Sequence, residues 1–492
     1  MVIMDSNAKS REQEVDWDNV KIPKYATVDV RYSVNKKNVT DLLNSVWNGA
    51  NSDLSELGVK IWREPFRCCE VTEFLFDDDF VEDLGKNFEE IELNEKRTDL
   101  YKFKQSEDLS SIDDPEAETL VKCLKGQCRQ WVEEVTGFEL TDKVHATFSS
   151  YSQSDYLLCH DDRCEDRKIA FILYCNKIWE ESDGGALELY DTDERGQPKN
   201  VVKTILPAYN KFVFFEVSDK SFHRVAEVLS RQRDRISVNG WFHSGNIPPP
   251  SPVSCNLLDS MAMSYHLPQD LPEKEFSSII QHRYLREEVQ VDIKKHFEEE
   301  SEVMLFDFLG ANFMNAVTND LHSAVEWKKV GPANHRLLSR SYRVFQDEEN
   351  LYGRLAQLIN ALKSKPMFEL LSKLTGLDFK IQQKEEMPRC SYEVQRWERG
   401  DYTVISDTDK LPTDYALDVI LFISDEVVLG EQSGGSVVYL DSEDGSELLS
   451  IPPADNCLAL VYRDKKTHRF TQYLSLLNNQ MHYYAIFATY IE

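Results

Sequence analysis

The stretch Tyr156-Leu157-Leu158-Cys159-His160-Asp161-Asp162 decides how the rest of the chain is interpreted. An apolar run ends at His160, and the carboxylate of Asp162 follows two positions later. Because side chains two residues apart on a strand point to the same face, this imidazole and this carboxylate are predicted to converge on one point. A single His-x-Asp is weak evidence in a chain with 11 histidines, so its meaning depends on the sequence downstream.

A second histidine and an arginine follow on strands predicted further along the chain. Residues 210–217 form an apolar run typical of a buried strand, His223 follows it, and Arg235 begins the next predicted strand. Two histidines and one carboxylate on one side of a metal leave other coordination positions open, as in non-haem Fe(II) oxygenases. We therefore predict that His160, Asp162 and His223 bind iron. The alternative is that each histidine is an ordinary residue of the core.

Arg235 is predicted to bind an anion inside the fold. A buried guanidinium needs an anionic partner because an unpaired charge there is costly, and its fork matches a carboxylate. A dicarboxylic keto acid fits, with its keto acid end on iron and its far carboxylate on Arg235. Ser237 faces the same way as Arg235 and can share that carboxylate, as can the phenol of Tyr174, while Tyr151 is predicted to line the pocket. The alternatives are an internal ion pair for Arg235 and core packing for the tyrosines.

Length and composition indicate a folded protein of two domains. The chain has 492 residues, which is too long for one compact core. Of these residues 41% are hydrophobic, as in a folded globular protein. No run of eighteen apolar residues is present, so no membrane span is expected. The formal net charge is −30. Such an excess repels nucleic acid, so no direct nucleic acid binding is expected, and it attracts a basic partner such as a ribosomal protein or a histone tail. The alternative is that the acidity serves solubility alone.

The ten cysteines and the N-terminus favour a reducing compartment. None of the cysteines shows the paired CxxC spacing of a zinc site, and residues 1–20 lack the apolar segment of a signal peptide. Reduced thiols without a secretory signal predict a cytoplasmic and nuclear protein.

Four segments are predicted along the chain. Residues 1–35 are expected to be loosely ordered, 36–245 to form the catalytic domain, 246–275 to be a Pro-rich linker and 276–492 to form a second domain without catalytic activity. Many short strands with turns between them, over residues 144–244, suggest a barrel or a double-sheet jelly roll. Helices are predicted at 39–47, 116–135, 274–309 and 348–374 by their apolar spacing.

The second strand-rich part, from residue 381 to the end, repeats the first. In this comparison Ser406, Thr408 and Gln480 stand where His160, Asp162 and Arg235 would be, and only His468 survives as the counterpart of His223. One imidazole, a serine and a threonine cannot hold iron. The second copy is therefore predicted to be a degenerate, metal-free relative that supports the structure, dimerises or binds a partner. The matched segments are 402–408 with 156–162, 434–441 with 184–191, 458–461 with 212–215 and 467–469 with 222–224.

The stretch from Phe148 to His243 resembles the 2-oxoglutarate- and Fe(II)-dependent oxygenase superfamily, and within it the ribosomal prolyl 3-hydroxylase family. The degenerate C-terminal copy resembles that family too, so the resemblance extends from about residue 60 to the end. It is carried by Leu157 to Asp162, Arg167 to Tyr174, Gly184 to Tyr190, Phe214 to Ser218, Phe222 to Val225 and Gly240 to His243.

The resemblance implies an α+β fold of two double-stranded β-helix domains with flanking helices, of which only the first is catalytic. It implies iron on His160, Asp162 and His223, and 2-oxoglutarate on Arg235 with Tyr174. O2 is then the second substrate and ascorbate the reductant. The implied target is a proline, hydroxylated at C3, in the small-subunit ribosomal protein at the decoding centre. An effect on translation accuracy or termination is implied as well, with translation or termination factors as further partners.

Three other functions remain open. The enzyme could act on another protein, although collagen-type prolyl hydroxylases usually carry Lys where Arg235 stands and are secreted. The chain could also be a translation or mRNA-decay interaction protein without catalysis, and both jobs can coexist. A metal-binding cupin without 2-oxoglutarate would leave Arg235 and Ser237 unexplained.

Overall fold

The protein is described by a computed structural model over residues 24–87, 90–164, 166–245, 264–323, 325–341, 353–379, 387–405, 411, 413–424, 433–478 and 482–492. The folded part begins earlier than predicted, because Val28, Val30 and Val34 are buried although they precede residue 36. Helix α5 (Glu273–Ile279) likewise begins inside the segment predicted as a linker.

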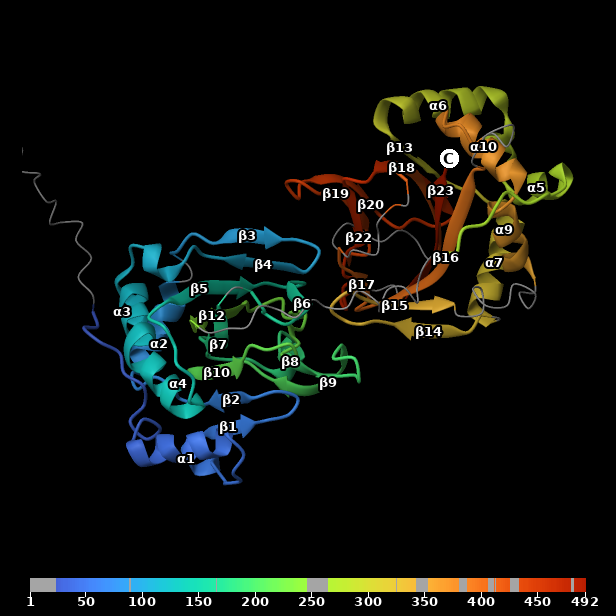
Figure 1. Cartoon of the computed structure of the whole chain (residues 1–492). Helices are drawn as coiled ribbons and strands as arrows, with labels where there is room; N and C mark the ends of the chain where they lie inside the picture. The colour runs from blue at the N-terminus through green and yellow to red at the C-terminus, as the bar shows by residue number, and fades with distance from the viewer. Residues whose placement is uncertain are drawn as a thin grey trace, which may run out of the picture.

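The first domain combines four α-helices with twelve strands (Figure 1). The predicted helix over 116–135 is present as α3 and α4, joined by a π-helical turn at Leu124–Cys128. The helices are α1 (Lys37–Trp47), α2 (Asp78–Asn87), α3 (Pro115–Cys123) and α4 (Arg129–Thr136). The strands are β1 (Val59–Trp62), β2 (Cys68–Val71), β3 (Asn94–Arg97), β4 (Tyr101–Gln105), β5 (Val144–Tyr151), β6 (Tyr156–His160), β7 (Arg167–Tyr174), β8 (Leu187–Thr192), β9 (Pro198–Ile205), β10 (Lys211–Glu216), β11 (His223–Val225) and β12 (Arg235–His243).

The twelve strands form one continuous sheet that folds over itself. Its order is β1-β2-β10-β7-β12-β5-β4-β6-β11-β8-β9, and β3 pairs with β4. Along β10, Phe212 and Phe214 belong to the core beneath the helices, whereas Val213 and Phe215 belong to the core inside the fold. This alternation is the period of two expected of strands covered on both faces. The face opposite the helices therefore lines the inside of the fold.

Helices α1 to α4 cover the outer face of the sheet. Trp47 stacks on Phe214 at 5.5 Å between ring centroids, and Trp131 packs edge-on against the same ring at 5.7 Å. These aromatic contacts bury large apolar areas and hold the helices to the sheet. The α+β fold class is therefore confirmed for this domain.

The second domain packs a helical layer on a sheet of its own. The predicted helix 274–309 is only partly present, because α6 ends at Glu300 and a strand follows, and the strands between 302 and 341 were not predicted. The helices are α5, α6 (Glu287–Glu300), α7 (Ala311–Ser323), α9 (Arg354–Leu362) and α10 (Lys365–Thr375). The strands are β13 (Glu302–Leu305), β14 (Trp327–Val330), β15 (Arg336–Ser341), β16 (Arg389–Glu398), β17 (Tyr402–Thr403), β18 (Tyr415–Ile423), β19 (Val437–Asp441), β20 (Glu447–Ile451), β21 (Cys457–Asp464), β22 (Thr467–Thr471) and β23 (His482–Ile491).

The strand order of the second domain repeats that of the first. The order β21-β18-β23-β16-β15-β14 corresponds to β10-β7-β12-β5-β4-β3, and β20-β19-β22 corresponds to β9-β8-β11. Strand β17 pairs with β15 as β6 pairs with β4. The repeat predicted from the sequence is therefore present in the pairing of the strands.

The pairing of β22 with β19 shows that one residue of the predicted repeat, the counterpart of His223, was assigned incorrectly. In the first domain His223 pairs with Leu189, four residues after Gly185. In the second domain the residue four positions after Gly435 is Tyr439, and its partner is Arg469. The prediction that His468 is the counterpart of His223 was therefore wrong by one position. In a strand, a shift of one residue moves a side chain to the opposite face.

The counterpart of Arg235 also differs from the prediction. Arg235 donates from Nε to the carbonyl of Gly185 at 2.8 Å, and in the second domain the hydroxyl of Tyr483 donates to the carbonyl of Gly435 at 3.0 Å. Arg235 pairs with Tyr151 across β12 and β5, as Tyr483 pairs with Trp397 across β23 and β16. Tyr483 therefore takes the position that was assigned to Gln480. Ser406, Thr408 and Gln480 lie outside the described residues.

The two domains meet through corresponding strands. Tyr156 of β6 packs on Tyr473 at 4.5 Å between ring centroids, and Tyr156, Leu158 and Tyr402 share one buried cluster. The backbone N–H of Ile405 donates to Asp99 of the first domain at 2.8 Å. The second domain thus packs directly against β6, the strand that carries His160.

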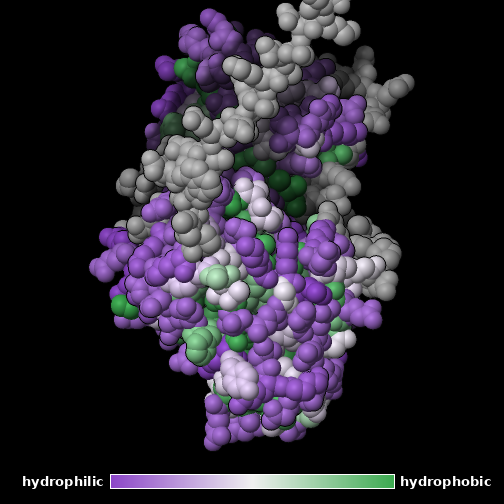
Figure 2. All heavy atoms as spheres, turned by 90° about the vertical axis from the view of Figure 1, so that its left-hand side faces the viewer, coloured by the Kyte–Doolittle hydropathy of each residue, from purple (hydrophilic) through white to green (hydrophobic). Residues whose placement is uncertain are grey.

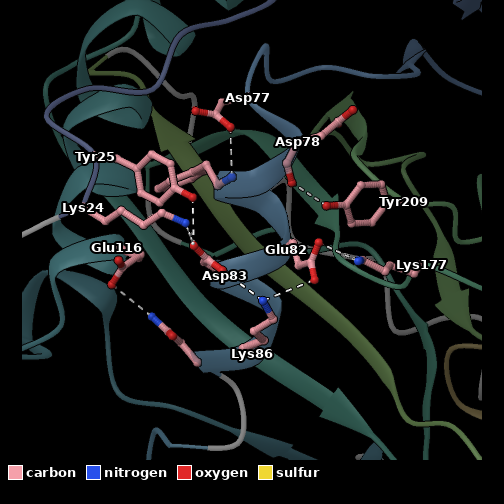
Figure 3. Close-up of polar contacts among 12 residues, drawn as sticks. Lys24, Tyr25, Asp77, Asp78, Glu82, Asp83, Lys86, Glu116, Lys177 and Tyr209 are labelled. Carbon is pink, nitrogen blue, oxygen red and sulfur yellow. Dashed lines mark hydrogen bonds and ion pairs between the residues drawn. The ribbon is translucent and has the colours of Figure 1, made fainter.

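The surface over the helices of the first domain is mostly hydrophilic, with apolar side chains scattered among polar ones (Figure 2). On α2 the acidic groups are held by lysines: Asp83 lies 2.7 Å from Lys24 and 3.1 Å from Lys86, and Glu82 lies 2.6 Å from Lys177 (Figure 3). These acidic groups thus have lysine partners and are not the source of the net negative charge. Among the described residues, no helix is long and apolar enough to span a membrane.

Candidate active site

The three predicted iron ligands lie together inside the first domain. Nε2 of His160 is 3.4 Å from Oδ1 of Asp162, and Nε2 of His223 is 3.5 Å from Oδ2 of the same carboxylate. The candidate ligand atoms all lie within 4.8 Å of one another. One metal ion can therefore be reached by all three side chains.

Backbone carbonyls orient both imidazoles. Nδ1 of His160 lies 2.8 Å from the carbonyl oxygen of Leu158, and Nδ1 of His223 lies 2.8 Å from that of Ser221. A proton on each Nδ1 satisfies these contacts and leaves each Nε2 as a lone-pair donor toward the shared point. Each Nε2 is therefore oriented toward the position that a metal ion would occupy.

The convergence of Asp162 has a different cause from the one predicted. Strand β6 ends at His160, which pairs with His223 across a bulge, and Asp162 lies beyond the strand with φ of 61°. The carboxylate is therefore brought back by a left-handed turn and not by strand alternation. Aspartate is one of the residues that adopts this backbone conformation at low cost.

The pKa shifts at the site favour an ionised Asp162 and a neutral His223. Burial opposes ionisation of Asp162, but His160 and His223 outweigh it and hold the pKa of this carboxyl below its usual range. Burial and the neighbouring His160 lower the pKa of His223 to about 4, against the attraction of Asp162. Burial disfavours the charged form of His160 as well, yet its hydrogen bond to Asp162 and the charge of that carboxylate raise its pKa. At neutral pH the site therefore offers one carboxylate and at least one neutral imidazole.

Arg235 is fully buried on β12 and is held by polar groups that carry no formal charge. Besides the carbonyl of Gly185, its guanidinium contacts the hydroxyls of Ser237 at 3.2 Å and Tyr174 at 3.4 Å. Within the described residues, no Asp or Glu forms an ion pair with it, so the internal ion pair weighed from the sequence is absent. A buried cation without a counterion is a site for an anion.

Aromatic rings enclose this guanidinium. It lies 4.9 Å from the ring centroid of Tyr151 and 5.0 Å from that of Tyr174, and Tyr151 stacks on Phe103 at 4.7 Å. Burial raises the pKa of both tyrosines against the charge of Arg235, so the phenols stay protonated. The charges of Arg235 and Asp162 both act on the phenol of Tyr151. The four predicted pocket residues, Tyr151, Tyr174, Arg235 and Ser237, are brought together.

Comparison with known proteins assigns both domains. Residues 146–243 match the model of the 2OG-Fe(II) oxygenase superfamily, and residues 273–491 match that of the oxoglutarate and iron-dependent oxygenase degradation C-terminal domain. The prolyl 3-hydroxylase OGFOD1 of Xenopus laevis is 35% identical over 467 residues, covering 89% of this chain and 89% of that protein. The mouse prolyl 3-hydroxylase OGFOD1 is 34% identical, covering 84% of this chain and 85% of that protein. The Drosophila melanogaster prolyl 3-hydroxylase sudestada1 is 31% identical, covering 89% of this chain and 85% of that protein.

The chain belongs to the OGFOD1 family of 2-oxoglutarate- and Fe(II)-dependent oxygenases. The family resemblance inferred from the sequence is thereby confirmed, and so is the oxygenase class. Residues 273–491 match a family model of their own, which corresponds to the second domain. This domain has the same strand order as the first, but different side chains fill its interior.

Sequence reasoning missed two groups that this family member places at its site. The Gly184-Gly185 pair was interpreted only as a turn, yet the carbonyl of Gly185 accepts from Arg235 and that of Gly184 accepts from the indole of Trp179 at 2.9 Å. Arg167 stacks on Trp241 at 3.7 Å and lies 3.9 Å from Asp162. The glycine pair could have been recognised from its recurrence in the second copy. The position of Arg167 has no comparable signal in the sequence.

Proposed function

We propose that this chain is an Fe(II)- and 2-oxoglutarate-dependent prolyl 3-hydroxylase, with His160, Asp162 and His223 as the iron ligands. The observation that carries the proposal is the pairing of this triad with Arg235, a buried cation that lacks a carboxylate partner among the described residues. The relatives named prolyl 3-hydroxylases support the reaction type. We take residues 36–245 as the catalytic unit and 276–492 as a unit without catalytic activity.

The donor set fits Fe(II). Two imidazole nitrogens and one carboxylate oxygen on one side of an ion match the requirements of non-haem iron and leave room for other ligands. The groups that orient the ligands are also present, because the carbonyl oxygens of Leu158 and Ser221 contact Nδ1 of the two imidazoles. When bound, Fe(II) with 2-oxoglutarate and O2 supplies the oxidising chemistry: C–H becomes C–OH as 2-oxoglutarate and O2 yield succinate and CO2. We propose ascorbate as the reductant that keeps the iron ferrous.

The chain's own groups do the positioning. Arg235 offers its fork to the far carboxylate of 2-oxoglutarate, and the hydroxyls of Tyr174 and Ser237 lie at hydrogen-bond distance from the same guanidinium. The ring of Tyr151 closes one side of this pocket. Since Tyr151, Tyr174, Arg235 and Ser237 are buried, water is excluded from the bound acid.

For the substrate, we propose a proline of the small-subunit ribosomal protein at the decoding centre, hydroxylated at C3. The net charge of −30 supports a basic protein partner, because opposite charges accelerate encounter. The compartments that follow from this substrate are the cytoplasm and the nucleus. We also propose translation or termination factors as further partners.

The test is 2-oxoglutarate turnover with and without a peptide from the decoding-centre loop. We expect succinate release that the peptide stimulates and a mass gain of one oxygen atom on one proline. Both should be lost in His160→Ala and Arg235→Ala, and both should persist in His468→Ala, a matched histidine change in the second domain. Succinate without peptide modification would retain the enzyme and reject the substrate. Failure of the wild type to bind Fe(II) would reject the enzyme and favour an interaction protein.

A further inference from the structure

Glu227 is a buried carboxylate that the proposed reaction does not use. It follows strand β11 four residues after His223, and it is 2% exposed. Its two carboxylate oxygens accept hydrogen bonds from the second domain, one from the hydroxyl of Ser475 and one from the backbone N–H of Leu476 at 2.7 Å. Burial raises its pKa against these hydrogen bonds, so ionising this group has a cost that its partners in the second domain only partly offset. Such a buried contact between domains is sensitive to the removal of either side.

The backbone of the same residue leads to the anion site. The carbonyl of Glu227 accepts from the N–H of Gly185 at 3.0 Å, and the carbonyl of Gly185 accepts from Nε of Arg235 at 2.8 Å. A Cβ on Gly184 would lie 2.3 Å from the carbonyl oxygen of Glu227, and Gly184 has φ of +71°. The two segments therefore approach so closely that a movement of Glu227 is transmitted to the glycine pair.

We infer that Glu227 is a positioning residue through which the second domain holds Arg235 in place to bind 2-oxoglutarate. The path runs from Leu476 to the carboxylate of Glu227, along its backbone to Gly185, and from there to Arg235. The inference rests on the proposed function, because it assumes that Arg235 binds the co-substrate. It assigns the second domain a role in catalysis although that domain carries no ligand of the triad.

Two other contacts between the domains begin at residues of the first domain that lie outside this path. The carboxylate of Asp99 accepts from Ile405, and Tyr156 stacks on Tyr473, but neither residue hydrogen-bonds to the glycine pair. Asp99 therefore provides a matched control: it is also an acidic side chain of the first domain that accepts a backbone N–H of the second. Loss of the two carboxylates should weaken the interface alike and affect the anion site differently.

The experiment measures anaerobic binding of 2-oxoglutarate and of Fe(II) to the full chain, together with the steady-state constants KM and kcat. For 2-oxoglutarate, we expect Glu227→Ala to raise both the dissociation constant and KM by about tenfold, because Gly185 and Arg235 are then no longer held in the position that binds the acid. Its Fe(II) affinity and its kcat at saturating 2-oxoglutarate should stay within about twofold of wild type. Glu227→Gln should recover most of the affinity, because its amide oxygen can still accept from Leu476. Asp99→Ala should leave both binding constants unchanged.

The outcomes separate the inference from the function on which it rests. Normal 2-oxoglutarate affinity in a folded Glu227→Ala would overturn the inference and leave the oxygenase intact. An equal loss in Asp99→Ala would also overturn it, because the effect would then belong to the interface as a whole. If Glu227→Ala fails to fold, Ser475→Ala removes one donor from the other side and is expected to raise KM in the same direction, and an unchanged KM there would count against the relay. A wild type that binds no 2-oxoglutarate would reject the proposed function itself.

Discussion

In the first domain the buried guanidinium of Arg235 has no carboxylate partner among the described residues, whereas in the second domain the partly buried Arg469 lies 2.9 Å from Asp418. Arg463 lies 2.7 Å from the same carboxylate. Asp418 is completely buried, and the two arginines hold its pKa below the usual value although burial opposes this. The first domain thus contains a buried arginine without a carboxylate partner among the described residues, whereas the arginines of the second domain are paired with Asp418.

The comparison extends to the residues around these charges. Where the first domain places Arg235 over the ring of Tyr151, the second domain stacks Tyr483 on Trp397 with ring centroids 6.0 Å apart. Where the first domain has His223, the second has Arg469. The second interior is closed by aromatic packing and internal ion pairs. What distinguishes a binding site from a core in this fold is therefore whether the buried charge is satisfied from within.

The largest expected effect comes from breaking the satisfied cluster. Asp418→Ala removes the buried carboxylate that Arg463 and Arg469 share, and it should lower the free energy of unfolding by about 4 kcal/mol. Chemical denaturation followed by fluorescence measures this loss. Asp418→Asn, which keeps the shape, should lose most of the same stability. If both variants lower the free energy of unfolding by less than about 0.5 kcal/mol, as an ordinary surface substitution does, the cluster does not stabilise the second domain.

The counterpart change in the first domain should affect activity and leave stability nearly intact. Arg235→Met removes a cation with no carboxylate partner among the described residues and retains most of the volume of the side chain. We expect the unfolding free energy to stay within about 1 kcal/mol of wild type. We also expect kcat/KM for 2-oxoglutarate to fall by about 100-fold. Thermal denaturation and succinate release measure the two quantities. A stability loss as large as that of Asp418→Ala would mean that the guanidinium is structural in both copies.

This comparison also shows what the sequence could predict and what it could not. The strands between 144 and 244, the triad and Arg235 were predictable, because alternation and residue type carry that information locally. The glycine pairs 184–185 and 434–435 were matched correctly, since glycine marks the same positive φ in both copies. The counterparts of His223 and Arg235 were not predictable. They depend on strand register and on the length of the preceding loop, and a shift of one residue places a side chain on the opposite face.

The two domains share one turn that is stabilised by an aspartate, and a smaller effect on stability is expected from its substitution. Asp155 and Asp401 occupy the same position before β6 and β17, and each accepts a backbone N–H three residues earlier at 2.9 Å. A lysine lies near each, Lys102 at 3.3 Å and Lys329 at 2.6 Å. Burial raises the pKa of Asp401 to about 6 despite Lys329, and it raises that of Asp155 too.

A raised pKa in the folded state sets the sign of the pH dependence. Folded Asp401 keeps its proton up to about pH 6, whereas the unfolded chain releases it near the ordinary value of 3.8. Its contribution to stability is therefore complete below that ordinary value and is lost as the pH rises through 6. Relative to wild type, Asp401→Asn should gain about 1 kcal/mol between about pH 5.5 and about pH 7.5. The difference in Tm between variant and wild type at the two pH values measures it, and a pH-independent difference would contradict the assignment.

The smallest effect is expected where charges meet in water. Asp83 on α2 contacts Lys24 at 2.7 Å and Lys86 at 3.1 Å, and these lysines hold its pKa below its usual value (Figure 3). Both lysine side chains are more than 60% exposed, so solvent and salt screen the pairs. Asp83→Asn should therefore change Tm less than Asp401→Asn does, and the change should disappear in high salt. Since a lowered pKa contributes its full stability above the ordinary value, any loss should shrink as the pH falls below that value toward the lower pKa of the folded state. A salt-independent loss as large as that of Asp418→Ala would contradict the distinction between exposed and buried charge on which the comparison of the two domains depends.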